Sequence, residues 1–158
     1  MFIRRLLVPV DLSARSVHAV AYACELAASS AGAEVDVLHV IAGPGQLRSA
    51  VEGYLQRPLP HATADDLGRA QAEVRRLVEE SARHDIRPRI LVDSGDPAAV
   101  IVRTAAESAA DLIVMTTRGH RGLGELVLGS VTHKVLNCAR CPVLTLARVD
   151  SDRDAGAI

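Results

Sequence analysis

The sequence has very few aromatic side chains: its 158 residues include no tryptophan, one phenylalanine and two tyrosines. The hydrophobic core must therefore consist of valine, leucine, isoleucine and alanine. The scarcity also argues against a protein that binds single-stranded nucleic acid, because such proteins stack bases on aromatic rings. The formal net charge of −1 offers no basic surface for a nucleic-acid backbone or an anionic membrane.

Long hydrophobic runs and a cysteine framework are absent as well. No apolar run reaches the roughly 18 residues of a membrane span. The N-terminal segment 1–11 has neither the longer apolar region nor the small-residue cleavage site of a signal peptide. Three cysteines, Cys24, Cys138 and Cys141, suit reduced thiols better than disulfides. We therefore expect a cytoplasmic protein that contacts no membrane.

The residues that are present alternate between short β-branched runs and longer helical patterns. Apolar residues make up 49% of the chain and charged residues 23%, as in an ordered domain. The runs predict five strands, over residues 3–10, 34–41, 88–92, 111–115 and 142–146. The fourth run is almost wholly apolar, so we expect it at the centre of the sheet.

Helices are predicted between these strands from their caps and their apolar spacing. Ser13 is a candidate N-cap for the first helix, which Gly32 ends. Thr63 is predicted to cap the second, long helix. Residues 95–97, Gly-Asp-Pro, predict a turn into the next helix, whose apolar stripe extends to Ala109.

Strands that alternate with helices predict an α/β domain with a five-stranded, parallel, doubly wound sheet. We place this single domain at residues 1–148 and a polar tail at 149–158. Folds of this kind bind ligands beyond the carboxyl ends of the strands, where the strand order reverses. Asp11 leaves the first strand at that edge.

A glycine-rich stretch leaves the fourth strand at the same edge. Residues 116–130 read TTRGHRGLGELVLGS and contain four of the 11 glycines. This is not a P-loop, because Ser130 stands where that motif needs lysine, and no G-x-G-x-x-G follows the first strand. Gly129 to Thr132 begin a predicted helix, whose free N–H groups attract phosphate. On the residues alone, a loop without a ligand stays an equal alternative.

The order and spacing of these segments resemble the universal stress protein family over nearly the whole chain. The resemblance is carried by residues 7–13, 38–40, 95–97, 111–115 and 141–144. Nucleotide-binding members of that family carry G-x2-G-x9-G-[ST] after the fourth strand. Counting back from Gly129 and Ser130 places Gly119 at the second glycine and Thr116 in place of the first.

The resemblance implies a Rossmann-like fold of the adenine nucleotide alpha hydrolase-like type with strand order 3-2-1-4-5. It also implies a cytoplasmic, homodimeric protein of the stress response, with ATP as cofactor, with or without Mg²⁺. By carry-over, the nucleotide site comprises Pro9, Val10, Asp11, Val40, Met115, Thr116, Arg118, Gly119, Gly129, Ser130, Val131 and Thr132. In this picture the backbone of Val40 contacts adenine. Asp11 lies near the base, the ribose or a metal-bound water, and Gly119 and the amides of 129–132 hold the phosphates.

Thr116 is the one departure from the glycine motif. A β-branched residue is a poor occupant if the position needs a positive φ, but it suits the end of a strand. Because the other motif positions are intact, we favour retained ATP binding. The alternative within the same fold is an interaction protein that binds no nucleotide.

Enzymatic, redox and metal chemistry have weaker support. No nucleophile–base–acid set is visible, so we predict a sensor or switch without catalytic residues. Cys138 and Cys141 follow a helix and precede a strand, the reverse of a thioredoxin-like site, and zinc would need further ligands. His39, inside an apolar strand, is expected to be a hydrogen-bonded core residue. The resemblance places dimerisation on the edge strand 142–146.

Overall fold

The computed structural model describes residues 2–30, 32–42, 62–82, 85–117 and 129–147. Over these ranges the strands form one parallel sheet in the order β3-β2-β1-β4-β5, which confirms the predicted fold class and strand order. The strands are β1 (Arg5–Val10), β2 (Glu34–Ala42), β3 (Arg89–Gly95), β4 (Leu112–Thr116) and β5 (Val143–Leu146). The tail predicted at 149–158 lies outside the described residues.

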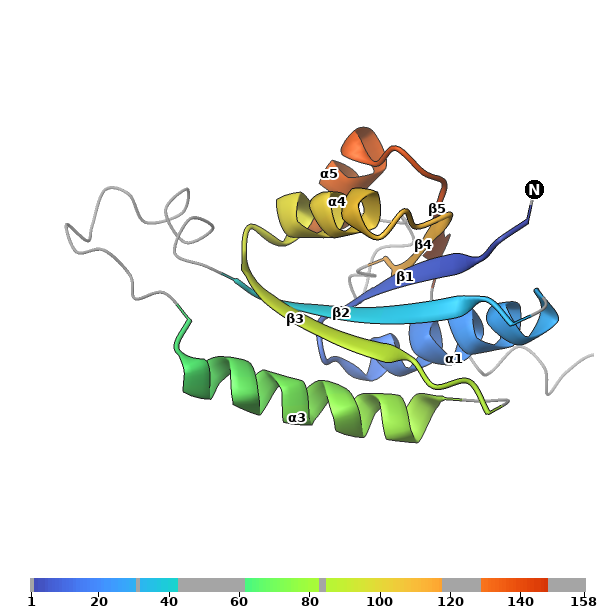
Figure 1. Ribbon diagram of the computed structural model, residues 1–158. Helices are drawn as coiled ribbons and strands as arrows, with labels where there is room; N and C mark the ends of the chain where they lie inside the picture. The colour runs from blue at the N-terminus through green and yellow to red at the C-terminus, as the bar shows by residue number, and fades with distance from the viewer. Residues whose placement is uncertain (1, 31, 43–61, 83–84, 118–128, 148–158) are drawn as a thin grey trace, which may run out of the picture.

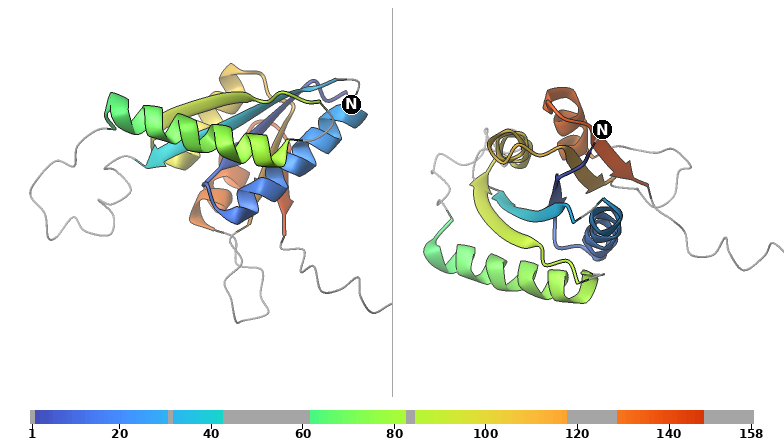
Figure 2. Two further views of the ribbon diagram at one scale, coloured as in Figure 1. Left: turned by 90° about the horizontal axis from the view of Figure 1, so that it is seen from below. Right: turned by 45° about the vertical axis from the view of Figure 1, so that its right-hand side comes forward.

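Helices cover both faces of the sheet (Figure 1). Helices α1 (Ala14–Ser29) and α3 (Ala64–Ser81) lie on one face, and α4 (Pro97–Glu107) and α5 (Ser130–Cys138) lie on the other. Figure 2 shows the same two layers from two further directions. The core is accordingly split in two, with Leu6 packed in the cluster of Val20 and Val74, and Leu7 in that of Ile101 and Val135.

The middle strand of the sheet is β1, which corrects the prediction made for the fourth strand; β4 is an interior strand between β1 and the edge strand β5. Its first four residues, Leu112, Ile113, Val114 and Met115, are all buried, as expected for a strand covered by helices on both faces. Next to β4, β5 forms an edge of the sheet and its four residues are half-buried. The sheet therefore has a buried apolar interior and a partly exposed edge at β5.

Of the two predicted caps, Thr63 is confirmed, because Thr63 and Asp66 form a reciprocal capping box at the start of α3. Asp96, for which the sequence predicted only a turn, caps α4 by accepting the N–H of Ala99 at 3.0 Å. Ser13 occupies the N-cap position of α1 without making a side-chain cap bond. Its hydroxyl bonds instead to the carboxylate of Asp11, so the predicted cap is wrong in its chemistry.

The first strand starts at Arg5 rather than at residue 3, and most other predicted strand ends differ from the structure by one residue. Two further boundaries, at the end of β3 and at the end of α4, are wrong by more than one residue. The third strand continues to Gly95, because its register with β2 extends to the Ala42–Gly95 pair. Gly95 has φ +143, which suits glycine, so a residue predicted for the turn ends the strand. Helix α4 ends at Glu107, and Ala109 lies beyond it, exposed, with φ 52 in the left-handed region.

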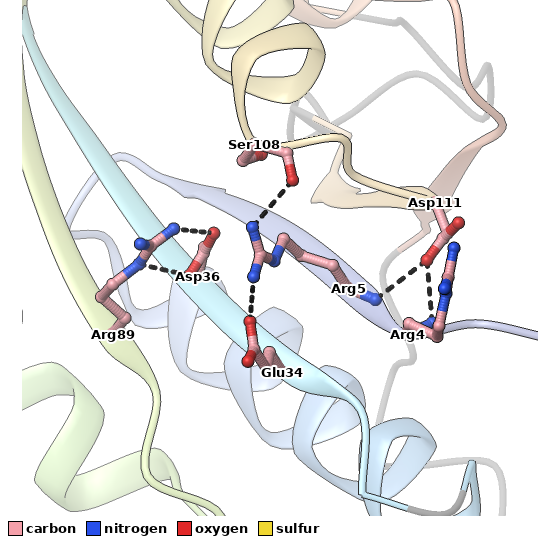
Figure 3. A network of polar contacts seen from close by, with 7 residues as sticks. All are labelled: Arg4, Arg5, Glu34, Asp36, Arg89, Ser108 and Asp111. Carbon is pink, nitrogen blue, oxygen red and sulfur yellow. Dashed lines mark hydrogen bonds and ion pairs between the residues drawn. The ribbon is translucent and has the colours of Figure 1, made fainter.

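A polar network joins the amino ends of the strands, at the edge opposite the predicted site (Figure 3). Asp111, predicted as the first residue of the fourth strand, instead precedes β4. Its carboxylate accepts the backbone N–H groups of Arg4 and Arg5 at 2.8 and 3.0 Å. The Arg5 guanidinium pairs with Glu34 and donates to the carbonyl of Ser108 at 2.9 Å. These bonds fix β1 to its neighbours on both sides.

Candidate functional site

A cleft of about 300 Å³ lies at the carboxyl ends of β1, β2 and β4, on the side of the sheet covered by α4 and α5. The chain continues from β1 towards β2 on one side and from β4 towards β5 on the other. The cleft therefore lies at the point where the strand order reverses, between β1 and β4. The lining residues in the described part of the chain are Pro9, Val10, Asp11, Leu38, His39, Val40, Ala42, Pro97, Ile101, Met115, Thr116, Gly129, Ser130, Val131 and Thr132.

Ten of the twelve residues predicted for the nucleotide site line this one cleft. They come from segments that are far apart in the sequence, at the ends of β1, β2 and β4 and the start of α5. The other two, Arg118 and Gly119, lie outside the described residues. The structure thus brings these ten residues together, while the binding of a nucleotide by them stays a prediction.

The turn after β1 holds Asp11 at the rim of the cleft. Its Oδ1 accepts hydrogen bonds from the backbone N–H and hydroxyl of Ser13, at 3.1 and 2.5 Å, and from the hydroxyl of Ser16 at 2.9 Å. Ser16 is buried, which makes it a rigid anchor. Leu12, between Asp11 and Ser13, has φ 60. This left-handed conformation is strained for a residue other than glycine, and such strained residues are often found at binding sites.

Thr116 ends β4 in an extended conformation. It pairs in register with Leu146 of β5 and is absent from the residues with positive φ. The position therefore needs no glycine conformation, and threonine suits a strand end. This removes the conformational objection to Thr116 in the motif.

The amino end of α5 faces the cleft. Gly129 is its N-cap, and the first intrahelical bond runs from the N–H of His133 to the carbonyl of Gly129 at 2.9 Å. The N–H groups of Ser130, Val131 and Thr132 therefore have no partner within the helix. All three residues line the cleft, so this end carries donors and the positive end of a helix dipole, which suits an anionic ligand.

The wall between Asp11 and α5 is apolar. Buried Leu38, Ile101 and Met115 belong to one core cluster, and half-buried Val40 packs against it. Apolar walls with a few directed polar groups are typical of small-molecule sites. The cleft thus offers an apolar surface flanked by a carboxylate on one side and a helix amino end on the other.

His39 is half-buried rather than a core residue, which corrects part of its prediction. Its Nδ1 lies 2.9 Å from the carbonyl oxygen of Val10, which confirms the predicted hydrogen bond. Because a carbonyl only accepts, Nδ1 carries the proton. The bond ties the ends of β1 and β2 together beside Asp11.

Five lining residues were not predicted: Leu38, His39, Ala42, Pro97 and Ile101. Two of them could have been predicted from the rule that ligands bind beyond the carboxyl ends of the strands, because Ala42 ends β2 and Pro97 follows the end of β3. Leu38 shares a strand face with Val40, and Ile101 lies one helical turn after Pro97. Applying the rule to every strand end, with these periodicities, would have found all but His39.

Redox and metal readings gain no support from the described residues. Cys138 is exposed at the end of α5, whereas Cys141 is half-buried, and burial raises the pKa of the Cys141 thiol and disfavours the reactive thiolate. In these same residues no group of three or more His, Cys, Asp or Glu side chains can hold a metal ion. Nor is any helix there both long and apolar enough to cross a membrane.

Comparison with known proteins gives one consistent result. The sequence model of the universal stress protein family matches residues 2–147. Universal stress protein YxiE of Bacillus subtilis is 32% identical over 144 residues, which cover 89% of this chain and 96% of the relative.

Two solved structures with the same fold contain adenine nucleotides. One is a universal stress protein in complex with cAMP, 25% identical with a TM-score of 0.58, covering 94% of this chain and 100% of the other. The second is the universal stress protein from Archaeoglobus fulgidus in complex with dAMP. It is 25% identical with a TM-score of 0.55, over 92% of this chain and 98% of the other.

Proposed function

Because this chain belongs to the universal stress protein family, we propose that its cleft binds an adenine nucleotide, ATP in particular. The protein then acts as a cytoplasmic, homodimeric sensor or switch of the stress response rather than as an enzyme. The observation that carries the nucleotide proposal is the convergence of Asp11, the strand ends and the amino end of α5 on one cleft. The cAMP and dAMP complexes of similar proteins support the adenine class.

Each side of the cleft has a distinct role in this proposal. The apolar surface of Val40, Ile101 and Met115 receives the flat base, where burial of both partners is favourable. Asp11, held by Ser13 and Ser16, presents an acceptor for ribose hydroxyl groups.

The phosphates lie at the amino end of α5. The N–H groups of Ser130, Val131 and Thr132 donate to phosphate oxygens, and the hydroxyl of Ser130 adds a further donor. Arg118 and Gly119 join them in the assignment that follows from the family. If Mg²⁺ accompanied ATP it would neutralise phosphate charge, and Asp11, the one carboxylate among the described lining residues, would be the residue available to hold it.

A switch fits the polar groups of the cleft better than a catalyst. Asp11 is the only carboxylate among the lining residues that the structure describes, and its Oδ1 already accepts bonds from two serines. The ring of His39 bonds to the carbonyl of Val10 through Nδ1. No nucleophile–base pair emerges from this set, so any hydrolysis of bound ATP is slow and incidental.

Dimerisation is proposed through the edge strand, residues 142–146. The N–H groups of Ile113 and Thr117 in and after β4 donate to the carbonyls of Pro142 and Leu146. In a parallel ladder, alternate residues of a strand direct their backbone groups to the same side. Since Pro142 and Leu146 face β4, the N–H groups of Val143 and Thr145 point towards the open edge. An edge with such donors pairs readily with another strand.

Isothermal titration of ATP into the purified protein tests the nucleotide proposal. Saturable binding is expected, and Gly129→Val should remove it, because branched carbons would occupy the approach to the first turn of α5. The matched control is Gly68→Ala on α3, where an added Cβ meets nothing within 4 Å. Absence of binding even at millimolar ATP would favour the interaction protein without nucleotide. Mass spectrometry of a co-purified ligand distinguishes ATP from AMP.

A further inference from the structure

Lysine occurs only once in the sequence, at position 134, and every other long cationic side chain is an arginine. Lys134 lies in α5, four residues after Ser130 and three after Val131, so it shares a helix face with two residues that line the cleft. Side chains of a helix lean towards its amino end, so the stem of Lys134 covers the first turn of α5. The single lysine therefore lies beside the end of the cleft to which the phosphates are assigned.

The ammonium of Lys134 connects α5 to α4, which packs against it (Figure 1). Its Nζ lies 3.4 Å from Oδ2 of Asp96, the N-cap residue of α4. The other carboxylate oxygen of Asp96 accepts the N–H of Ala99 at 3.0 Å. The next residue, Pro97, lines the cleft. The ion pair thus stands between the amino ends of two helices, next to the cleft.

This ion pair is weak enough to be exchanged. Its side chains are 56% and 37% exposed, and exposed pairs contribute little because water and salt screen them. Lysine also suits a change of partner, since its charge is compact and sits on a flexible stem with three donors. The buried Asp36, in contrast, is held by two nitrogens of Arg89 in a fixed geometry. Lys134 can therefore leave Asp96 at small cost.

The described lining of the cleft has too little positive charge for a nucleotide with several phosphates. It contains no basic side chain, and its one charged group is the carboxylate of Asp11. The amino end of α5 adds a partial positive charge of roughly half a unit. The predicted Arg118 lies outside the described residues. Lys134 brings a full positive charge next to the amides of α5.

We propose that Lys134 makes the cleft prefer nucleotides with several phosphates, by leaving Asp96 and donating to phosphate oxygens at the amino end of α5. This inference rests on the proposed function, since it requires a nucleotide in the cleft. Because the attraction grows with the charge of the ligand, Lys134 contributes more to the binding of ATP than to that of AMP. Asp96 competes with the nucleotide for the same ammonium, so the charge of Asp96 lowers the affinity.

Calorimetric titrations of ATP and AMP into the wild type and two Lys134 variants test this preference. In Lys134→Met the dissociation constant for ATP should rise about tenfold and that for AMP less than about threefold, because a charge-assisted hydrogen bond is lost mainly with ATP. Lys134→Arg keeps the positive charge and should stay within about threefold of the wild type for ATP. Added salt should reduce the difference between ATP and AMP more in the wild type than in Lys134→Met.

Two further variants separate the exchange from a general effect of surface charge. Asp96→Asn keeps a side-chain cap on α4 but removes the competing charge, so ATP should bind about threefold more tightly. Arg103→Met is the matched control, because it breaks a similarly exposed ion pair, with Asp93, in which neither residue lines the cleft. Arg103→Met should leave both dissociation constants unchanged. Circular dichroism establishes that every variant is folded.

Because the chain has one lysine, its ammonium can be observed directly. Reductive methylation with carbon-13 formaldehyde labels Lys134 and the α-amino group and keeps both positive charges. The nuclear magnetic resonance signal of Lys134 is the one that is missing from Lys134→Arg. This signal should shift saturably with ATP, over the same concentrations as the calorimetric binding, and should shift less at saturating AMP.

The outcomes distinguish this inference from the proposed function. If the wild type binds ATP but Lys134→Met binds both nucleotides as the wild type does, the nucleotide cleft stands and the role of Lys134 is overturned. Equal losses for ATP and AMP in Lys134→Met overturn the preference, and weaker ATP binding by Asp96→Asn overturns the competition. A lysine signal that saturating ATP leaves unmoved overturns the contact with phosphate. A wild type that binds no nucleotide overturns both proposals.

Discussion

The hydroxyl of Thr132, in the first turn of α5, donates to the main-chain carbonyl of Thr116, at the end of β4, over 3.4 Å. Thr132 is 4% exposed, so the bond is shielded from water. It joins the two ends of the segment that begins after β4 and returns at Gly129. The bond therefore sets the position of the α5 amino end relative to the strand ends that line the cleft.

Replacing this hydroxyl should weaken both the fold and nucleotide binding. Thr132→Val keeps the shape but leaves the Thr116 carbonyl without that donor, at a cost of about 0.5–1.5 kcal/mol in the free energy of unfolding. We expect a several-fold loss of ATP affinity, measured by titration calorimetry, and a lower urea midpoint. Thr132→Ser retains the hydroxyl and should retain most of the affinity. Equal affinity in the valine variant would show that the bond positions nothing that the ligand contacts.

Restoring the family's glycine at Thr116 should not improve binding. Thr116 is extended and paired with Leu146, so Thr116→Gly gains no needed conformation and loses up to about 1 kcal/mol of stability through chain entropy. Chemical denaturation and ATP titration measure the two effects. Binding more than tenfold tighter in the glycine variant would identify the threonine side chain as an obstruction.

The sequence predicted the order of elements and most of the cleft because both follow from local patterns and one topological rule. Apolar alternation locates β4 and the helix faces, and the doubly wound connection then brings Asp11, Thr116 and Ser130 to one edge without any knowledge of contacts. The capping residue Thr63 was recognisable for the same local reason.

What the sequence could not predict depends on register and on backbone conformation. The pair of Asp36 and Arg89, 53 residues apart, exists because β2 and β3 align these positions as neighbours. A lone acidic residue within an apolar strand was the available sign that a partner was needed. The left-handed φ of Ala109, which closes α4, has no sign in an alanine.

Loss of the Arg89 guanidinium should destabilise the protein substantially. Asp36 is 1% exposed and accepts from Nε and Nη2 of Arg89 at 2.8 and 2.7 Å, so Arg89→Met leaves a buried carboxylate without these donors. Because the Arg89 side chain is itself 56% exposed, we expect a loss of about 2–4 kcal/mol, towards the lower end for broken buried pairs.

Urea denaturation measures this loss, and an exposed ion pair provides the control. Arg103→Met removes the partner of Asp93 at the surface and should cost under about 1 kcal/mol. The double variant Asp36→Leu with Arg89→Met should recover much of the stability, because no charge then remains buried. Equal losses for the two arginine variants would contradict the role assigned to the buried carboxylate.

Acidification should remove the contribution of Asp111. The backbone N–H groups of Arg4 and Arg5 bond to its carboxylate, and with the charges of both arginines they hold the pKa of Asp111 below its ordinary value. A carboxyl whose pKa is lower in the folded state stabilises the fold above the unfolded pKa, and that contribution disappears as the pH falls through the folded pKa.

The variant Asp111→Asn tests this contribution, because an asparagine side chain does not titrate. Its melting temperature should therefore lie below that of the wild type near pH 7, and the gap should close below about pH 4. Thermal melts from neutral pH into this acidic range measure the gap, in which other carboxyls such as Asp66 cancel because both proteins contain them. A gap that stays constant through the acidic range would mean that the charge of Asp111 contributes nothing to holding β1.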